Sequence, residues 1–230
     1  MNEPEKLTIK VNDIDSITAL LYPAAKKNRT GTTIILGHGA GANQLSPFMR
    51  LFASGLAERG LDALTFNFVY MENRRGAPDQ KAKLESCYSA VIDTATSDKK
   101  LKGNRLLVGG KSMGGRIASQ VAAAGDDRIA GLVFLGYPLH PPGQPQKLRT
   151  DHWPSIKAPM LFVQGTRDSL GTPKEIKPIL KKLKLPAEIY EIETGDHSFK
   201  VQKSAGVGQD IVYERAMDRI VEWSRMFDKL

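Results

Sequence analysis

The chain has 230 residues, 41% of them hydrophobic and 25% charged, and its formal net charge is +8. This composition is ordinary for a globular protein. The single cysteine, Cys87, excludes an internal disulfide, and no apolar run approaches the length of a membrane-spanning helix. The polar first residues lack the apolar core of a signal peptide, so we expect a cytoplasmic protein.

The first part of the chain predicts three strands and a helix. Apolar and polar residues alternate over residues 7–11, as in a half-exposed strand, and residues 16–22 predict a second strand. The apolar stretch at residues 33–36 predicts the first buried strand, which runs into a glycine-rich loop. A helix should begin at Pro47 and end at Gly60. Its expected inward face consists of Phe48, Leu51, Phe52 and Leu56.

The middle of the chain continues the alternation of strand and helix. Residues 61–68 predict a strand, residues 69–78 a loop, and residues 79 to about 96 a helix. The apolar run at residues 106–108 predicts a buried parallel strand, which a tight turn and a further helix should follow. Residues 129–135 predict the next buried strand.

The last part of the chain begins with an irregular segment. Residues 136–156 contain five prolines and no periodic pattern, so they predict a connection across the carboxyl edge of the sheet. Residues 160–163 predict a strand, and a helix should lie around residues 174–183. An edge strand at residues 188–192 and a final helix at about residues 211–227 complete the pattern.

This order of elements predicts the fold class. Strands that alternate with helices imply an α/β domain with a mostly parallel sheet and helices on both faces. We find no repeat or linker, so this single domain should span residues 1–230. In open α/β sheets, ligands bind at the carboxyl ends of the strands, and the loops there should therefore carry the functional side chains.

The turn after residues 106–108 carries the sequence GKSMG at residues 110–114. A Gly-x-Ser-x-Gly motif between a strand and a helix is typical of a nucleophile elbow, which would expose the hydroxyl of Ser112 above the sheet. The flanking glycines leave room for this strained turn. A phosphate-binding loop is an alternative, because Lys111 and Ser112 resemble the end of such a motif. Arg105, however, stands where that motif requires a glycine.

Three loops that follow predicted strands carry the side chains of a catalytic triad. Ser112, Asp168 and His197 occur in the order that α/β-hydrolases use. Ser112 would attack a carbonyl group, His197 would transfer its proton, and Asp168 would hold the imidazole in the required tautomer. Asp196 is a competing acid, although its position beside His197 favours hydrogen bonds to the local backbone.

Two backbone N–H groups are candidates for an oxyanion hole. The N–H of Met113 directly follows the nucleophile, and the N–H of Ala40 lies in the glycine-rich loop after the first buried strand. His38, in the same loop, is a candidate substrate contact, although bracing of the loop is the simpler interpretation. Tyr137 and His140, in the proline-rich connection, are further candidates. No spacing of His, Cys or carboxylate residues suggests a metal site, and no cofactor is expected.

Arg74 and Arg75 follow the strand predicted at residues 61–68, so their loop should also lie at the carboxyl edge of the sheet. A guanidinium of Arg75 turned inward would suit a carboxylate or phosphate on the substrate. The alternative is that both arginines are solvated or pair with Glu72 or Asp79.

The net charge could also indicate an anionic macromolecule as partner. The lysines are dispersed, and the cluster at residues 177–184 occupies one face of a predicted amphipathic helix, which favours a solvated surface. No nucleic-acid-binding motif or aromatic platform accompanies the charge, so neither nucleic acid nor a membrane is an expected partner. The oligomeric state stays open.

Five segments together resemble a known family. They lie at residues 37–41, 110–116, 136–143, 164–168 and 195–199. In combination they resemble the small α/β-hydrolases grouped with dienelactone hydrolase, and more closely the branch that includes testis-expressed protein 30 and a subunit of a histone acetyltransferase complex. The resemblance extends from about residue 32 to the C-terminus. Dienelactone hydrolases use a cysteine nucleophile, whereas this chain has Ser112, so activity on dienelactone is not expected.

The resemblance implies an α/β-hydrolase fold. The short stretch between the strands predicted at residues 129–135 and 160–163 leaves no room for a large helical lid. The ordered triad predicts a serine hydrolase that cleaves a small ester or thioester through an acyl-enzyme intermediate, and the basic charge favours an anionic substrate. The alternative is a catalytically idle, hydrolase-like scaffold that binds a protein partner.

Overall fold

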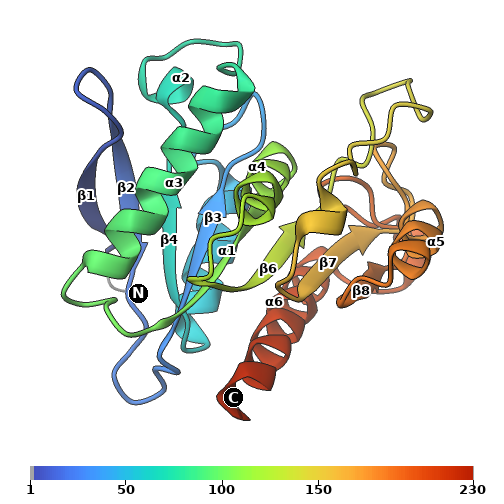
Figure 1. Cartoon of the computed structure of the whole chain (residues 1–230). Helices are drawn as coiled ribbons and strands as arrows, with labels where there is room; N and C mark the ends of the chain where they lie inside the picture. The colour runs from blue at the N-terminus through green and yellow to red at the C-terminus, as the bar shows by residue number, and fades with distance from the viewer. Residues whose placement is uncertain (1–2, 230) are drawn as a thin grey trace.

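A twisted sheet runs through the centre of the molecule, and helices cover both of its faces (Figure 1). This computed structural model describes residues 3–229. Its eight strands are β1 (Glu5–Lys10), β2 (Ser16–Tyr22), β3 (Thr32–Gly37), β4 (Asp62–Phe66), β5 (Arg105–Lys111), β6 (Ile129–Leu135), β7 (Met160–Gly165) and β8 (Ala187–Ile192). Their order across the sheet is β1-β2-β4-β3-β5-β6-β7-β8. β2 pairs antiparallel with both β1 and β4, and all other neighbouring strands are parallel.

The helices divide between the two faces of the sheet. They are α1 (Pro47–Glu58), α2 (Val69–Glu72), α3 (Lys81–Ser97), α4 (Met113–Ala123), α5 (Pro173–Leu183) and α6 (Gln209–Ser224), with 3₁₀ turns at Trp153–Ser155, Lys203–Ala205 and Arg225–Lys229. One hydrophobic core joins one face to α3, α4 and α5, and the other joins the opposite face to α1 and α6. None of the described helices combines the length and apolarity needed to cross a membrane.

The central strands are buried on both sides because both faces of the sheet are covered. Along β3, Ile35 packs into the core under α3 and α4, whereas Ile34 and Leu36 pack into the core under α1 and α6. Successive side chains of a strand point to opposite faces, so a strand buried on both faces needs a continuous apolar run. This explains why the apolar runs at residues 33–36, 129–135 and 160–163 correctly predict strands.

Two local predictions are wrong. The segment predicted as a loop after β4 begins with the short helix α2, whose Glu72 accepts hydrogen bonds from the side chains of Thr18 and Asn67 at 2.6 and 2.9 Å. In α1, Leu51 was predicted to face inward but has an exposed fraction of 37%. The residues of α1 that face the sheet are Met49, Phe52, Ala53 and Leu56, which follow the helical period and leave Leu51 on the opposite side.

The sheet is tightly packed directly beneath the elbow. The hydroxyl of Tyr88, on α3, lies 3.0 Å from the carbonyl oxygen of Ile35 and 2.8 Å from that of Gly109, and it accepts a hydrogen bond from the Gly109 N–H at 2.9 Å. A Cβ at Gly109 would lie 1.8 Å from the carbonyl oxygen of Val133, so no side chain fits there. Tyr88 therefore ties α3 to the two strands, β3 and β5, that present the elbow and the loop beside it.

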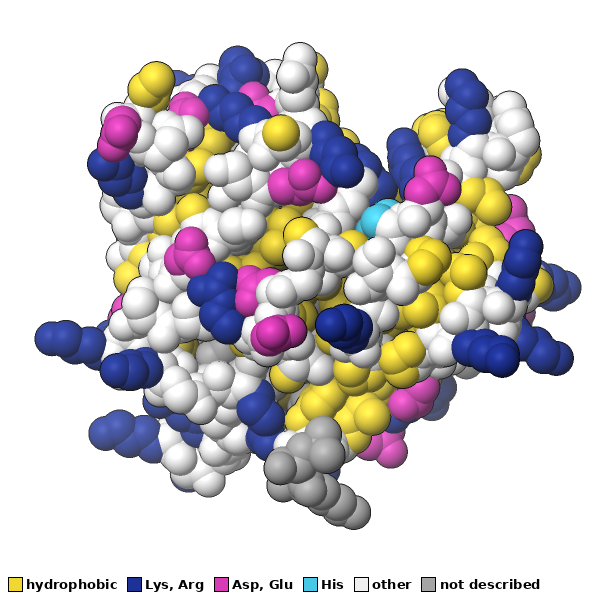
Figure 2. Space-filling view, viewed as in Figure 1, with side chains coloured by type: hydrophobic (Ala, Val, Ile, Leu, Met, Phe, Trp, Pro, Cys, Tyr) yellow, Lys and Arg dark blue, Asp and Glu magenta, His cyan; other side chains and the backbone are white. Residues whose placement is uncertain are grey.

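One face of the molecule shows how the basic charge is distributed. On the face shown in Figure 2, Lys and Arg side chains are scattered among acidic ones. On α5, Ile176 and Leu180 are buried while the lysines of the helix are exposed, as the amphipathic pattern predicts.

Candidate active site

The turn from β5 into α4 has the strained backbone of a nucleophile elbow. Ser112 adopts φ 52° and ψ −114°, a conformation that non-glycine residues rarely occupy. A Cβ at Gly110 or at Gly114 would lie 2.2 or 2.1 Å from the carbonyl oxygen of Gly37, at the end of β3. Both flanking positions must therefore be glycine, because the elbow is pressed against the neighbouring strand.

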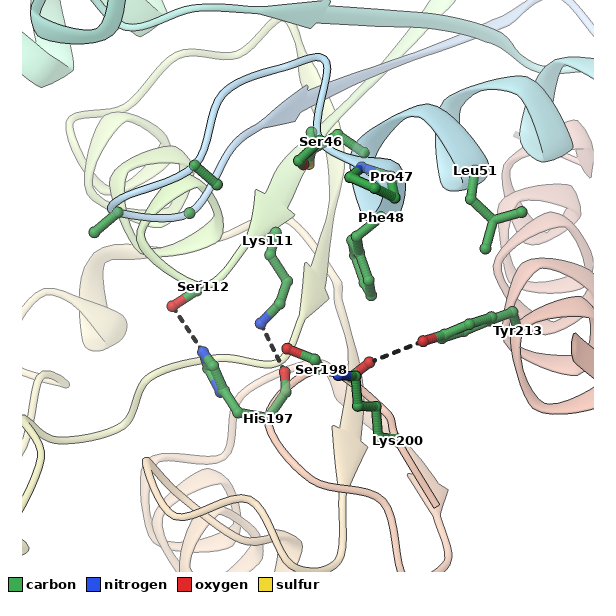
Figure 3. Close-up of a pocket in the computed structure, with 14 residues that line it drawn as sticks. Ser46, Pro47, Phe48, Leu51, Lys111, Ser112, His197, Ser198, Lys200 and Tyr213 are labelled. Carbon is green, nitrogen blue, oxygen red and sulfur yellow. Dashed lines mark hydrogen bonds between the residues drawn. The ribbon is translucent and has the colours of Figure 1, made fainter. Parts of the chain in front are cut away.

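The structure brings Ser112, Asp168 and His197 together in one hydrogen-bonded chain. Ser112 Oγ lies 2.8 Å from His197 Nε2, and His197 Nδ1 lies 2.7 Å from Asp168 Oδ2 (Figure 3 shows the first of these contacts). An ionised carboxylate accepts hydrogen bonds only, so Nδ1 carries the imidazole proton and Nε2 is free to accept from the serine hydroxyl. This is the arrangement that a general base needs.

Asp168 is held more firmly than a surface carboxylate would be. Its exposed fraction is 1%. Besides His197, its oxygens accept hydrogen bonds from the side-chain amide of Gln164 and the backbone N–H of Leu170, both at 2.8 Å. These donors stabilise the charge that burial would otherwise disfavour and fix the direction of the carboxylate.

Asp196 has a different position. Its Oδ1 accepts hydrogen bonds from the backbone N–H groups of Ser198 and Lys200, at 2.7 and 2.9 Å. The carboxylate thus closes the turn that carries His197, and it does not contact the imidazole. This is the local bonding to the backbone that its place in the sequence favours.

The loop after β3 lies against the elbow. Gly39 lies beside Ser112, and a Cβ at Gly39 would be in ordinary van der Waals contact with the serine Cβ, at 3.6 Å. Within residues 3–229, neither the N–H of Ala40 nor that of Met113 donates a hydrogen bond. Both belong to segments that border Ser112, so two backbone donors are available where an oxyanion would form.

His38 braces this loop. Its Nδ1 donates to the carbonyl oxygen of Gly39 at 2.8 Å, and its Nε2 accepts from the backbone N–H of Phe68 at 3.1 Å. An acceptor role at Nε2 requires the neutral imidazole, and burial lowers the pKa of His38 to about 4. His38 therefore stays neutral at physiological pH and links the loop after β3 to the segment after β4.

A pocket of about 480 Å³ opens beside Ser112. Its walls come from the loop after β3, the first turns of α1, the loop after His197 and Tyr213 of α6 (Figure 3). Apolar surface is supplied mainly by Pro47, Phe48 and Leu51, and polar groups by Lys111, Ser46, Ser198, Lys200 and Tyr213. Ser112, His197 and Ala40 all line this pocket, so it is a candidate place for a substrate.

The sequence model of a family described as an alpha/beta hydrolase domain matches residues 30–225. The chain belongs to this family. An α/β serine hydrolase homologue from Coxiella burnetii has the same fold, with 19% identity, a TM-score of 0.74 and coverage of 95% of this chain and 98% of that one. A dienelactone hydrolase from Anabaena variabilis is 20% identical, with a TM-score of 0.73 and coverage of 94% and 97%. A lid-free α/β serine hydrolase from Xanthomonas campestris is 19% identical, with a TM-score of 0.70 and coverage of 86% and 88%.

The four predicted substrate contacts lie outside the pocket lining of this α/β-hydrolase domain. The side chain of His38 is buried and braces the loop to which it belongs. Arg75 donates to Asp79 at 2.6 Å, in an i,i+4 ion pair with the guanidinium half exposed. The Tyr137 hydroxyl is buried and donates to the carbonyl oxygen of Arg149 at 2.8 Å. His140 is buried, with Nε2 3.4 Å from a carboxylate oxygen of Glu175.

The proline-rich segment does not roof this pocket either. Within residues 136–159 the structure has one 3₁₀ turn, Trp153–Ser155, and the indole N–H of Trp153 donates to Tyr137 Oη at 3.1 Å. These contacts fasten the segment over β6 and β7 on the side of α4 and α5, whereas the pocket lies on the side of α1 and α6. No described residue of the proline-rich connection lines this pocket.

Sequence reasoning missed several residues of the hydrolase pocket. Lys111, Phe48 and Tyr213 all line it. Lys111 occupies a motif position with no fixed role, Phe48 belongs to a helix face that was predicted to face the core, and Tyr213 lies in the C-terminal helix. Only Lys111 carries a usable signal, because the residue before the nucleophile in an elbow necessarily starts beside the site. Among the described residues, no group of three or more His, Cys, Asp or Glu side chains is arranged to hold a metal ion.

Proposed function

We propose that this protein is a serine hydrolase that cleaves a small ester or thioester through an acyl-enzyme intermediate. The observation that carries this proposal is the continuous chain from Ser112 Oγ through His197 to Asp168 at the mouth of a substrate-sized pocket. Serine hydroxyls are poor nucleophiles alone, and an adjacent base held by a buried carboxylate is what activates them.

In the proposed reaction, Ser112 Oγ attacks the substrate carbonyl while its proton passes to His197 Nε2. The resulting oxyanion accepts hydrogen bonds from the N–H groups of Ala40 and Met113. Collapse of this intermediate breaks the bond to the alcohol or thiol, which leaves with the proton from His197. Water then attacks the acyl-enzyme while His197 takes its proton. His197 returns this proton to Ser112 Oγ as the acid is released. Asp168 stabilises the imidazolium in both halves of the reaction.

We also propose that the chain belongs to the branch that includes testis-expressed protein 30 and a subunit of a histone acetyltransferase complex, on the five segments named in the sequence analysis. A cytoplasmic location stays a prediction of the sequence. The rival function, a catalytically idle scaffold that binds a protein partner, requires neither the aligned hydrogen bonds of the triad nor the strained backbone of Ser112. The serine hydrolase accounts for both features.

Covalent labelling by a fluorophosphonate probe tests the proposal directly. We expect the wild-type protein to be labelled and the Ser112→Ala variant to remain unlabelled, because the probe reacts only with an activated serine. Circular dichroism should first show that both proteins are folded. A screen of short-chain p-nitrophenyl esters, thioesters and lactones would then identify the preferred bond. Folded wild-type protein that resists the probe would support the scaffold instead.

The pocket also predicts a preference for short acyl chains. Each methylene buried in the pocket gives about 0.8 kcal/mol, or about fourfold in kcat/KM, but methylenes beyond the walls remain in water and add nothing. With a pocket of about 480 Å³ and no helical lid between β6 and β7 in the described chain, kcat/KM should stop rising at short chains. A series of acetyl, butyryl, octanoyl and dodecanoyl esters measures this. Higher kcat/KM for the dodecanoyl than for the butyryl ester would contradict it.

A further inference from the structure

Lys111 places an ammonium group in the wall of the candidate active site. Its Nζ donates to the backbone carbonyl oxygen of His197 and lies 5.7 Å from the centre of the Phe48 ring (Figure 3). The side chain points from the elbow toward the loop that carries His197, between the catalytic serine and the apolar wall of α1. It therefore borders the space in which the part of a substrate next to the scissile bond must lie.

The positive charge of Lys111 is not balanced by an ion pair. Within residues 3–229, no carboxylate forms a salt bridge with Lys111, and its one hydrogen-bond acceptor is the neutral carbonyl of His197. An ammonium group has three donors, so two of them remain available. The charges of Asp168 and Asp196 act on Lys111 without an ion pair. Their carboxylate oxygens accept hydrogen bonds from other groups, as described above.

The pocket contains no acidic side chain among its described lining residues, and its second cation, Lys200, lies at the exposed rim. Lys111 is half-buried. An unpaired, partly desolvated cation favours an anionic partner, because folding has already met part of the cost of removing the cation from water. The apolar walls of Phe48 and Leu51 would exclude water from such a pair.

We propose that Lys111 selects substrates that carry a carboxylate within a few bonds of the scissile ester or thioester. This inference rests on the proposed hydrolase function and names the substrate class of the same site. The carboxylate can belong to the acyl group, as in the half-esters of short dicarboxylic acids, or to the alcohol. Both have the same chemistry at Lys111, and the experiment separates them.

The titration of Lys111 gives this selection a pH dependence. Burial lowers the pKa of Lys111 to about 8, although the charges of Asp168 and Asp196 oppose the shift. The other titratable groups around it are His197, Lys200 and the Tyr213 hydroxyl. Lys111 therefore carries its positive charge mainly below pH 8 and loses it above pH 8, whereas a substrate carboxylate stays ionised over this whole range. The advantage of anionic substrates should therefore be present below pH 8 and fade above it.

The test compares monoethyl succinate with ethyl 4-methylpentanoate, in which a neutral isopropyl group replaces the carboxylate, by pH-stat assay. A second pair, carboxymethyl and isobutyl acetate, places the same groups on the alcohol. In the wild type we expect kcat/KM to favour the anionic member of one pair by roughly ten- to a hundredfold. Lys111→Met should remove this preference while reducing activity on the neutral ester much less. Lys174→Met, an exposed lysine of α5 outside the site, is the matched control and should retain it.

Three results would overturn the inference. One is an equal loss on both esters in Lys111→Met, which would make Lys111 only a support for the His197 loop. Another is the same loss of preference in Lys200→Met, which would assign it to the general positive field. The third is a wild-type protein that favours the anionic member of neither pair. This last measurement needs no variant and therefore holds even if Lys111→Met fails to fold.

A binding experiment separates the failure of this inference from the failure of the proposed function. In the Ser112→Ala background, NMR titration with monoethyl succinate and with carboxymethyl acetate should show binding of at least one ligand that Lys111→Met weakens about tenfold or more. If such binding occurred without any turnover by wild-type protein, the proposed hydrolase function would be wrong and the inference about Lys111 would stand. If neutral esters were turned over but neither ligand showed binding that depends on Lys111, the hydrolase function would stand and the inference about Lys111 would be wrong.

Discussion

Replacement of Ser112 or His197 by alanine is expected to remove nearly all esterase activity, and the double replacement should cost little more. Each single change should lower kcat by on the order of 10⁴- to 10⁶-fold, because the nucleophile and its base act as one unit. The 2.8 Å contact between Ser112 Oγ and His197 Nε2 is the physical reason, since the proton of the hydroxyl passes along this contact in the proposed reaction. The measurement is kcat of the single and double variants on the best short-chain ester.

The matched control for this series is Ser204→Ala, an exposed serine in the 3₁₀ turn Lys203–Ala205. It changes the same chemical group outside the site and should leave kcat unchanged. Losses that add in free energy in the double variant would show that the two residues act independently, contrary to the proposed mechanism.

Asp168→Asn is expected to lower kcat by on the order of 10⁴-fold while the protein remains folded. The asparagine amide would donate to His197 Nδ1, so the imidazole would carry its proton on Nε2, where it cannot accept from Ser112. In the wild type, the Leu170 N–H donates to Asp168 Oδ1. The asparagine oxygen can accept the same hydrogen bond, so the fold should persist. Turnover measured together with the melting temperature separates loss of the tautomer from loss of structure.

Asp196→Asn is the comparison that decides which acid serves His197. Its Oδ1 accepts from two backbone N–H groups, and an asparagine oxygen can accept the same bonds. We therefore expect its kcat to stay within a few fold of the wild type. If Asp196→Asn lost more turnover than Asp168→Asn, the assignment of the acid would have to be reversed.

The sequence by itself determined the fold class and the elements that carry the triad. The strands at residues 16–22 and 129–135 were predicted to the residue, because apolar runs bounded by turn residues are a local property of the chain. The spacing of the glycines around Ser112 is equally local. Glycines are required at these two positions wherever a strand turns this sharply into a helix beside another strand. Here a Cβ at either position would collide with the carbonyl oxygen of Gly37. The order Ser112, Asp168, His197 then followed from the order of the loops.

The tertiary structure decided which residues surround the pocket and which do not. Arg75 forms an ion pair with Asp79, four residues further along the chain. The Tyr137 hydroxyl donates to a carbonyl oxygen within the proline-rich segment, and His140 lies beside Glu175 of α5. The pocket instead draws on Leu51, Phe48 and Tyr213, because α1 and α6 converge on the other side of the elbow. Sequence periodicity shows that a helix has an apolar face, but the position of a neighbouring helix decides whether a residue beside that face is covered. That position depends on contacts between residues far apart in the chain, which no local pattern contains.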